Sequence, residues 1–408
     1  MAEKQAYERL IDYARVHTAS VDDGDTTPST QRQFDLARML EREMKELGVS
    51  DVFVDEHCYV YGKLPATAGL EDKPCVGFLA HLDTIPDFSG ENVQPRVIQN
   101  YDGGDIPLGE SGRVLSPERF PHLRELCGKT LVVTDGTTVL GADDKAGVAE
   151  IMTAVERLLR GNVPHGPVAI GFCPDEEVGH GAALMDLDRF GAALAYTLDG
   201  AAPGEIEYEN FNAAAATVTF RGFNVHPGSS KDTMVNASLV AMQFNAMLPA
   251  GDTPRDTEGY EGFFHLTDMS GNVEKATLQY IVRDHDAGAF EARKRMMAHN
   301  AKLLNARYGE GTVTLALRDQ YRNMVEAVKP HFEVVEKAMA ASRAMGVEMK
   351  AVPIRGGTDG AQLSFRGLPC PNLPTGSYGH HGPYEHAVAE EMEQLVQLVL
   401  NIVQEFTK

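Results

Sequence analysis

The sequence predicts an α/β protein. A large domain has a mixed, mostly parallel sheet flanked by helices, and an inserted α+β domain has a four-stranded sheet and two helices. Short apolar runs of strand length alternate with runs of helical periodicity. Several of these apolar runs end in His or acidic residues followed by turn residues, which is typical of strand ends in an open α/β sheet. After Asp199 the predicted order becomes strand, helix, strand, strand, helix, strand, which suits a small sheet backed by helices.

The N-terminal part is predicted to contain two helices followed by two strands. A capping box of Thr30 and Gln33 opens the second helix, and Gly48 ends it. The region from Phe88 to Cys127 is rich in Gly, Pro and charge, so it is either an ordered loop near a functional site or a surface excursion. The expected elements are helices at 7–14 and 30–47 and strands at 51–54 and 59–64.

The insertion is predicted to span residues 209–324, and residues 1–208 and 325–408 form the large domain. After the insertion the alternation of helix and strand resumes, and the chain closes with a helix at 387–406. Within the insertion the expected strands are 213–220, 263–267, 276–282 and 312–317, and the expected helices are 235–247 and 290–308.

Four of the apolar runs are followed by residues that can bind a metal ion. If their strands run parallel, all four junctions lie along one edge of the sheet. One imidazole and several carboxylates gathered there would repel one another unless cations neutralise them, so the sequence predicts a metal site. The junction residues are His81 and Asp83 after 76–80, Asp143 and Asp144 after a run ending at Leu140, Asp175 to Glu177 after 168–172, and Asp199 after 193–198.

Each motif also has a purely structural interpretation. Taken alone, the pair Asp143 and Asp144 is more often a helix cap, because a helical run begins near Lys145. His81 and Asp83 can form a surface pair, although Asp83 is well placed to accept the second N–H of a metal-bound imidazole.

The acids at 175–177 can form a charged loop, or one of them can bind metal while its neighbour acts as general base. Near the C-terminus, either His380 or His381 could supply a second imidazole ligand. The other histidine would then face solvent or lie beside the ligands without binding the metal.

Composition excludes several classes of protein. The 408 residues carry a net charge of −22 and no basic run, which argues against general nucleic-acid binding. Five cysteines are scattered singly, so neither a disulfide framework nor a cysteine-based zinc site is expected. The N-terminal stretch has no signal-like pattern and no apolar run reaches membrane-spanning length, so a cytoplasmic protein without membrane contact is expected.

The ordered set of His, Asp, Glu-Glu, Asp and His resembles the di-zinc aminoacylase/carboxypeptidase/aminopeptidase superfamily, and within it the peptidase T family of tripeptide aminopeptidases. The resemblance covers nearly the whole chain. His380 stands where relatives carry Tyr, and His180 where Lys is familiar, which affects only fine specificity. The matching stretches are 80–84 (AHLDT), 140–147 (LGADDKAG), 174–179 (PDEEVG), 196–200 (YTLDG), 224–237 (NVHPGSSKDTMVNA), 260–263 (YEGF), 353–364 (PIRGGTDGAQLS) and 381–382 (HG).

This resemblance implies a role for each of eleven residues. Asp143 would bridge two metal ions, with His81 and Asp199 completing one ion and Glu177 and His381 the other. The remaining implied roles are Asp83 orienting His81, Glu176 as general acid/base, His226 as a lid histidine reaching the partner subunit's site, and Asn236, Arg283 and Arg355 as substrate anchors. Without the resemblance, His226 is better interpreted as a loop residue stabilising the turn at Pro227.

The resemblance also implies an activity. The expected enzyme removes the N-terminal residue from tripeptides by attack of a metal-bound hydroxide, with Glu176 as general base. It would use two Zn²⁺ per subunit, with Mn²⁺ or Co²⁺ as replacements, and form a homodimer through the insertion, which would act as a lid and dimerisation domain. The alternatives are a dipeptidase or an N-acyl-amino-acid deacylase with the same site, and a non-catalytic metal- or peptide-binding protein on the same fold.

Overall fold

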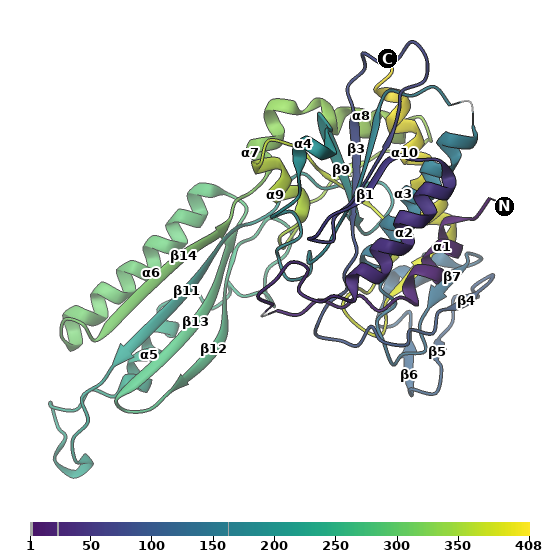
Figure 1. The fold of residues 1–408 in the computed structure, drawn as a ribbon. Helices are drawn as coiled ribbons and strands as arrows, with labels where there is room; N and C mark the ends of the chain where they lie inside the picture. The colour runs from purple at the N-terminus through teal and green to yellow at the C-terminus, as the bar shows by residue number, and fades with distance from the viewer. Residues whose placement is uncertain (1–2, 23, 162) are drawn as a thin grey trace. The chain divides into compact units, whose positions relative to one another are not determined.

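The computed structural model describes residues 3–22, 24–161 and 163–408 (Figure 1). The first two residues of the N-terminal stretch, in which no signal is expected, lie outside the described residues. Within the described ranges, no helix combines the length and apolar character needed to cross a membrane. The chain forms two compact units. Unit 1 comprises Met1–Tyr208, Glu326–Val352 and Thr358–Lys408, and unit 2 comprises Glu209–Val325 and Pro353–Gly357.

The centre of unit 1 is a six-stranded mixed sheet in the order β1-β2-β8-β3-β9-β16. β8, β3, β9 and β16 run parallel, whereas β1 and β2 pair antiparallel. β3 and β8 are buried throughout, as expected for strands covered on both faces. The predicted α/β domain is therefore confirmed. The bounds are β1 Ser50–Val54, β2 Val60–Leu64, β3 Val76–His81, β8 Val168–Cys173, β9 Leu194–Gly200 and β16 Asn372–Pro374.

Helices cover both faces of this sheet. α3 packs on β3 and β9 and is flanked by α1, α2 and α10, while α8 packs on α10 (Figure 1). On the other face, Phe190 of α4 and Leu363 of α9 join one buried cluster with Leu79 of β3. The bounds are α1 Ala6–Ala14, α2 Gln33–Leu47, α3 Ala142–Arg160, α4 Leu187–Phe190, α8 Glu333–Arg343, α9 Asp359–Phe365 and α10 Ala389–Glu405.

The region from Phe88 to Cys127 is ordered and has its own core. Its side chains pack with those of a second, four-stranded sheet in the order β17-β18-β7-β4, and include Tyr101, Leu115 and Leu123. The strands are too short to give a periodic signal in the sequence. They are β4 Arg96–Ile98, β5 Ile106–Leu108, β6 Arg113–Leu115, β7 Leu131–Val133, β17 Ser377–Tyr378 and β18 His386–Val388, with a 3₁₀ turn at Pro121–Leu126. A short parallel pair joins β10 Glu205–Ile206 to β15 Lys350–Ala351.

The capping box predicted at Thr30 and Gln33 is not formed, and the helix begins one turn later, at Gln33. The Gln33 side chain instead donates from Nε2 to Asp175 Oδ1 at 2.6 Å. Asp175 also accepts from the backbone and hydroxyl of Ser29, each at 2.6 Å. Because Asp175 directly precedes Glu176, this long-range contact fixes the loop after β8, and it cannot be inferred from local spacing.

Unit 2 contains the predicted four-stranded sheet and two helices, and the sheet is antiparallel throughout. The strand order is β12-β13-β11-β14, and α5 and α6 pack on the sheet. The bounds are β11 Asn212–Arg221, α5 Ala237–Ala246, β12 Phe263–Gly271, β13 Lys275–Asp284, α6 Ala287–Tyr308 and β14 Val313–Tyr321. The segment Pro353–Gly357, which is predicted from the sequence to belong to the large domain, groups with this unit. The role of unit 2 as a lid and dimerisation domain stays a prediction.

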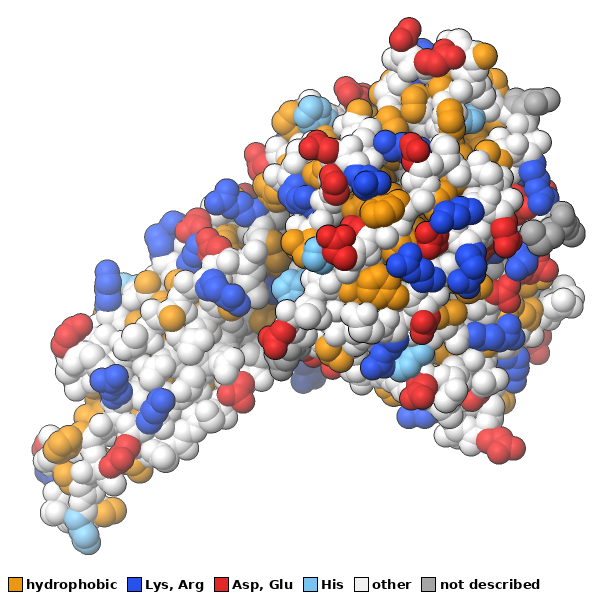
Figure 2. All heavy atoms as spheres, viewed as in Figure 1, with side chains coloured by type: hydrophobic (Ala, Val, Ile, Leu, Met, Phe, Trp, Pro, Cys, Tyr) orange, Lys and Arg blue, Asp and Glu red, His pale blue; other side chains and the backbone are white. Residues whose placement is uncertain are grey.

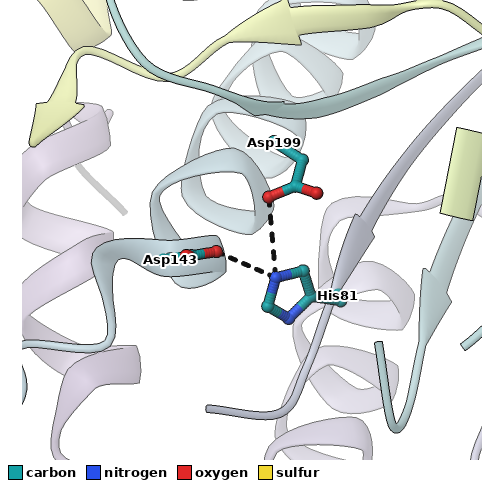
Figure 3. A group of neighbouring side chains, drawn as sticks. All are labelled: His81, Asp143 and Asp199. Carbon is teal, nitrogen blue, oxygen red and sulfur yellow. Dashed lines mark hydrogen bonds and ion pairs between the residues drawn. The ribbon is translucent and has the colours of Figure 1, made fainter. Parts of the chain in front are cut away.

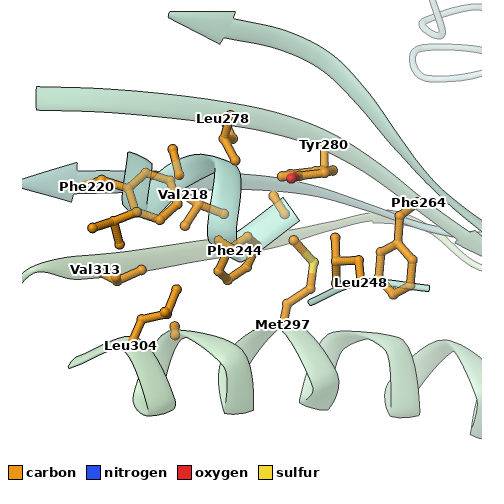
Figure 4. Packing of buried hydrophobic residues seen from close by; sticks show 14 of the residues in the cluster. Val218, Phe220, Phe244, Leu248, Phe264, Leu278, Tyr280, Met297, Leu304 and Val313 are labelled. Carbon is orange, nitrogen blue, oxygen red and sulfur yellow. The ribbon is translucent and has the colours of Figure 1, made fainter. Parts of the chain in front are cut away.

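The core of unit 2 lies between its sheet and its helices (Figure 4). Phe244 of α5 is fully buried and meets Phe220 edge-on, with ring centroids 5.8 Å apart. Met297 and Leu304 of α6 are buried in the same cluster. On the face of the molecule drawn in Figure 2, basic and acidic side chains are interspersed, so the negative net charge is not gathered there into a single patch.

We predict that Phe244→Ala lowers the free energy of unfolding by about 3–5 kcal/mol, because it removes a fully buried ring and leaves a cavity. Urea unfolding of the parent and variant measures the change. Leu303→Ala on α6 is the control, since Leu303 is 47 % exposed and should change stability by less than about 0.5 kcal/mol. Equal effects of the two substitutions would contradict the packing described for unit 2.

Candidate metal centre

The first group of candidate metal ligands is centred on His81, at the C-terminal end of β3. His81 Nδ1 lies 3.0 Å from the backbone oxygen of Asp83 and 3.4 Å from its Oδ1. Both oxygens accept, so Nδ1 carries a proton, and Nε2 is the ring nitrogen that can face a metal ion. Nε2 lies 3.0 Å from Asp143 Oδ1 and 3.6 Å from Asp199 Oδ1 (Figure 3). One imidazole and two carboxylates thus converge around one point.

Asp83 has a wider role than the sequence suggests. Its backbone carbonyl makes the shorter contact with His81, and its carboxylate accepts from the backbone N–H groups of Glu176 at 2.9 Å and Glu177 at 3.2 Å. The fully buried Asp83 therefore positions the loop after β8 as well as the imidazole at the end of β3.

The second group contains Asp143, Glu177 and His381. His381 Nε2 lies 3.1 Å from Asp143 Oδ2 and 3.2 Å from Glu177 Oε2. Its backbone φ is +64°, a left-handed conformation that non-glycine residues seldom adopt and that occurs more often at functional sites. The His381 side chain is 51 % exposed whereas that of His81 is 2 % exposed, so the two groups differ in access to solvent.

Asp143 belongs to both groups, one oxygen facing each imidazole. Each group offers one imidazole nitrogen and two carboxylate oxygens within 4.8 Å of one another. Nitrogen and oxygen donors of this kind suit Zn²⁺ and, with lower preference, Mn²⁺ or Co²⁺. The residues present therefore fit a pair of divalent cations that share Asp143.

Charge supports the same fit, because burial penalises the ionised form of most carboxyls here. Burial raises the pKa of Glu177 to about 8, and the neighbouring charge of Asp143 adds to the shift. Burial also raises the pKa values of Asp199 and Glu176 above the usual carboxyl range. A bound cation would restore their ionised forms.

Asp143 itself stays ionised. Burial alone would raise its pKa, but the imidazoles of His380, His381 and His81 outweigh burial and hold the pKa well below its usual value. The hydrogen bond to Asp143 in turn raises the pKa of His381 to about 9.

The two interpretations of the Asp143–Asp144 pair apply to different residues. Asp144 Oδ1 accepts from the N–H of Gly147 at 3.2 Å, which is cap geometry, and its Oδ2 accepts from the N–H of His81 at 3.0 Å. Gly147 must be glycine, because a Cβ would lie 2.1 Å from the Leu198 carbonyl of β9. Asp144 thus caps the helix, which leaves Asp143 free to face the histidines.

The prediction of a strand directly before Asp143 is wrong. Residues 139–141 are not in any sheet, so among the four predicted junctions those after β3, β8 and β9 follow strands of the sheet and the one before Asp143 does not. The backbone N–H groups of Leu140 and Gly141 donate instead to the carboxylate of Glu385. This apolar run is buried as a loop held by a side chain, and its composition resembles that of a strand.

His380 is tied to the site by a chain of hydroxyl groups. The Gly200 carbonyl can only accept, so Thr375 Oγ1 donates to it at 2.7 Å and must accept from Ser377 Oγ at 2.8 Å. Ser377 Oγ then accepts from His380 Nε2 at 2.8 Å, and His380 Nδ1 lies 3.6 Å from Asp143 Oδ2. Among the two candidate histidines, His381 is in the second ligand group and His380 lies beside it.

Glu176 lies next to Glu177 and belongs to neither ligand group among the described residues. Burial raises the pKa of Glu176, and the nearby charge of Asp199 raises it further, so Glu176 lies close to the site. A carboxyl beside two ligand groups, with no ligand position of its own, is suited to proton transfer.

The other four predicted site residues belong to unit 2 and have partners there. His226 Nδ1 accepts from the N–H of Gly228 at 3.1 Å. It therefore stabilises its own turn, which is the role expected for it without the family resemblance. Asn236 caps α5 through Leu239 N–H at 3.3 Å. Arg283 donates to the Ala214 and Val282 carbonyls, and Arg355 donates to the carbonyls of Gly259 and Glu261. Their roles toward a substrate stay predictions.

Comparison with known proteins finds a family model, sequences and folds similar to this chain. The model of Peptidase family M20/M25/M40 matches residues 139–405. The chain is 51 % identical over 403 residues to a peptidase T from Exiguobacterium and 51 % identical over 401 residues to one from Clostridium perfringens, with 98 % of each chain covered. Its fold is similar to that of aminopeptidase PepT from Bacillus cereus, with a TM-score of 0.79, 24 % identity and 100 % of both chains covered. It is also similar to a dinuclear metal binding peptidase of the M20 family from Bacillus subtilis, with a TM-score of 0.65, 14 % identity and coverage of 98 % and 97 %.

We predict that Asp143→Ala loses both tightly bound divalent cations, because each ligand group loses a carboxylate oxygen and its charge. Metal analysis after exhaustive dialysis should give two ions per chain for the parent and fewer than one for the variant. Asp102→Ala, which removes an exposed carboxylate, is the control and should keep both ions. Two tightly held ions in Asp143→Ala would show that Asp143 is not the shared ligand.

Proposed function

Because the chain belongs to Peptidase family M20/M25/M40 and, within it, to the peptidase T family, we propose that it is a metal-dependent aminopeptidase that removes the N-terminal residue from tripeptides. The observation that carries this proposal is Asp143 shared by two ligand groups, with Glu176 beside them. A structural similarity to a tripeptidase from Staphylococcus aureus, with a TM-score of 0.77 at 19 % identity and coverage of 100 % and 99 %, is consistent with the same fold.

In this proposal His81, Asp143 and Asp199 hold one Zn²⁺, and Asp143, Glu177 and His381 hold the other, with Mn²⁺ or Co²⁺ as substitutes. When bound, such a pair polarises the scissile carbonyl and lowers the pKa of a water molecule. Asp83 keeps the His81 proton on Nδ1, so Nε2 stays available as a ligand.

Glu176 performs the proton transfer in this mechanism. Its carboxylate takes a proton from the attacking water as the water oxygen bonds to the carbonyl carbon, and it returns the proton to the amine nitrogen as the C–N bond breaks. The backbone N–H of Glu176, bound by Asp83, holds the residue at the end of β8 while this happens.

The remaining parts of the proposal concern unit 2, the assembly and the compartment. His226 donates to the developing oxyanion in the partner subunit's site of a homodimer, and Asn236, Arg283 and Arg355 anchor the peptide. A cytoplasmic location rests on the singly placed cysteines of the sequence. A dipeptidase or an N-acyl-amino-acid deacylase would share the metal site, so substrate assays separate these alternatives from an aminopeptidase.

We predict that Glu176→Gln keeps both cations but lowers kcat roughly 10²–10⁴-fold, because an amide cannot accept the proton of the attacking water. Tripeptide hydrolysis and metal content are measured on the same sample. Glu118→Gln, which changes an exposed carboxylate, should leave both unchanged. Parental activity in Glu176→Gln would assign the base to another group.

We predict that N-acetylation of a tripeptide lowers kcat/KM by roughly 10²-fold or more, because an acidic group that pairs with the free ammonium is left buried and unmatched. Free and acetylated forms of one tripeptide are assayed side by side. Comparable rates on the two forms would move the assignment to the deacylases.

We predict that mixing two inactive variants restores one active site per dimer if His226 acts across the interface. His226→Ala supplies Glu176 and borrows His226 from a Glu176→Gln partner, whereas the other site lacks both groups. A heterodimer purified through two different tags should recover up to about half the parental activity, since one of its two sites is complete. An inactive heterodimer would place His226 in its own subunit's site or outside catalysis.

A further inference from the structure

The carboxylate of Glu385 binds three backbone N–H groups of the segment that carries Asp143. Glu385 Oε2 accepts from Leu140 at 2.7 Å and from Gly141 at 2.8 Å, and Oε1 accepts from Asp143 at 2.9 Å. Glu385 is only 1 % exposed. Hydrogen bonds from N–H groups to a buried carboxylate are shorter and stronger than those to neutral acceptors, so this is a firm attachment.

The attachment replaces the backbone pairing that a strand would give. Residues 139–141 lie in no sheet, so the buried N–H groups of Leu140 and Gly141 depend on Glu385 for an acceptor. Gly141 adopts φ +73°, and a Cβ there would lie 3.0 Å from the methyl group of Thr84. The backbone position of the residues directly before Asp143 is therefore fixed by one side chain and not by the hydrogen bonds of a β-sheet.

Glu385 also belongs to the loop that carries the second candidate imidazole. It follows His381 by four residues and directly precedes β18, which pairs with β7. Its own N–H donates to the Gly382 carbonyl at 3.3 Å, which closes the turn that begins beside His381. One buried carboxylate thus joins the segment of Asp143 to the loop of His381, although these two residues are 238 positions apart.

We propose that Glu385 is a positioning residue that fixes Asp143 relative to His381 and thereby sets the affinity of the second ligand group for its cation. Glu385 touches no reacting atom and acts only through the backbone of residues 140–143. This inference rests on the two-metal site of the proposed function and adds to it a residue outside the ligand set.

The chemistry requires a carboxylate. Both oxygens of Glu385 accept, one from two N–H groups and the other from one. In Glu385→Gln an NH₂ group replaces one of the two oxygens. In either orientation of the amide, this NH₂ donor then faces at least one backbone N–H donor, and the two cannot form a hydrogen bond. The segment then loses at least one hydrogen bond and gains a repulsive contact, with little change in side-chain volume.

The test compares Glu385→Gln with Glu391→Gln. Glu391 is a matched control, because it is 6 % exposed and both oxygens of its carboxylate have a partner, Lys129 Nζ at 2.5 Å and the Tyr378 hydroxyl at 2.7 Å. Metal-free protein is titrated with Zn²⁺ against a chromophoric chelator, and the visible absorption of the Co²⁺-loaded protein is recorded. We expect Glu385→Gln to bind one of the two ions, that of the second ligand group, roughly 10–100-fold less tightly, with an altered Co²⁺ spectrum, and Glu391→Gln to match the parent.

Hydrogen exchange in the metal-free protein gives a second readout that needs no cation. The backbone amides of residues 140–143 should exchange faster in Glu385→Gln than in the parent or in Glu391→Gln. If Glu385→Gln does not fold, Glu385→Asp keeps both oxygens on a shorter stem and should show weakening of the same kind but smaller size.

Parental affinity and an unchanged Co²⁺ spectrum in Glu385→Gln would overturn the proposal, even if its thermal stability falls as much as that of Glu391→Gln, because the role would then be structural only. A parent protein that binds no divalent cation would overturn the two-metal proposal and this inference with it. The two failures are distinguishable, because in the second the parent itself fails to bind.

Discussion

The two carboxylate oxygens of Asp143 face two imidazoles that come from residues 62 and 238 positions away in the chain. Several elements of unit 1 hold this arrangement. The parallel strands β3, β8 and β9 end at one edge and deliver His81, the Glu176–Glu177 loop and Asp199. α3 brings Asp143 to the same edge, and its Gly147 allows close contact with β9. The remaining candidate ligand, His381, lies in the loop between β17 and β18 of the small antiparallel sheet.

Gathering acids in a buried place is costly, and the fold offsets part of this cost by giving three of the carboxylates backbone N–H partners. Asp83 binds the N–H groups of Glu176 and Glu177, Asp144 binds those of His81 and Gly147, and Glu385 binds those preceding Asp143. These three acids hold the chain, whereas Asp143, Glu177 and Asp199 are the candidate carboxylate ligands for cations. The two sets differ in what each carboxylate accepts, because among the described residues only the first set accepts from backbone N–H groups, which leaves it fewer lone pairs for a metal ion.

Much of this could be predicted from the sequence, because apolar runs that end in His or acid mark strand ends and the order strand–helix–strand–strand–helix–strand marks unit 2. The failures concern long-range side-chain contacts. The run ending at Leu140 resembles a strand in composition, but the backbone N–H of Leu140 donates to Glu385, 245 residues away, and not to a neighbouring strand. The Thr30–Gln33 capping box fails because Gln33 binds Asp175. Glu385 itself follows His381 closely enough to suggest a role, yet nothing in the local spacing says which backbone it binds. The strands at 96–115 are simply too short to show a period.

Anomalous diffraction from crystals grown with Zn²⁺ or Co²⁺, measured at the absorption edge of the metal, tests the central claim that Asp143 joins two cation sites. We expect two peaks per chain on opposite sides of the Asp143 carboxylate, one about 2.0–2.2 Å from His81 Nε2 and the other at a similar distance from His381 Nε2. A single peak, or two peaks of which one does not contact Asp143, would contradict the account.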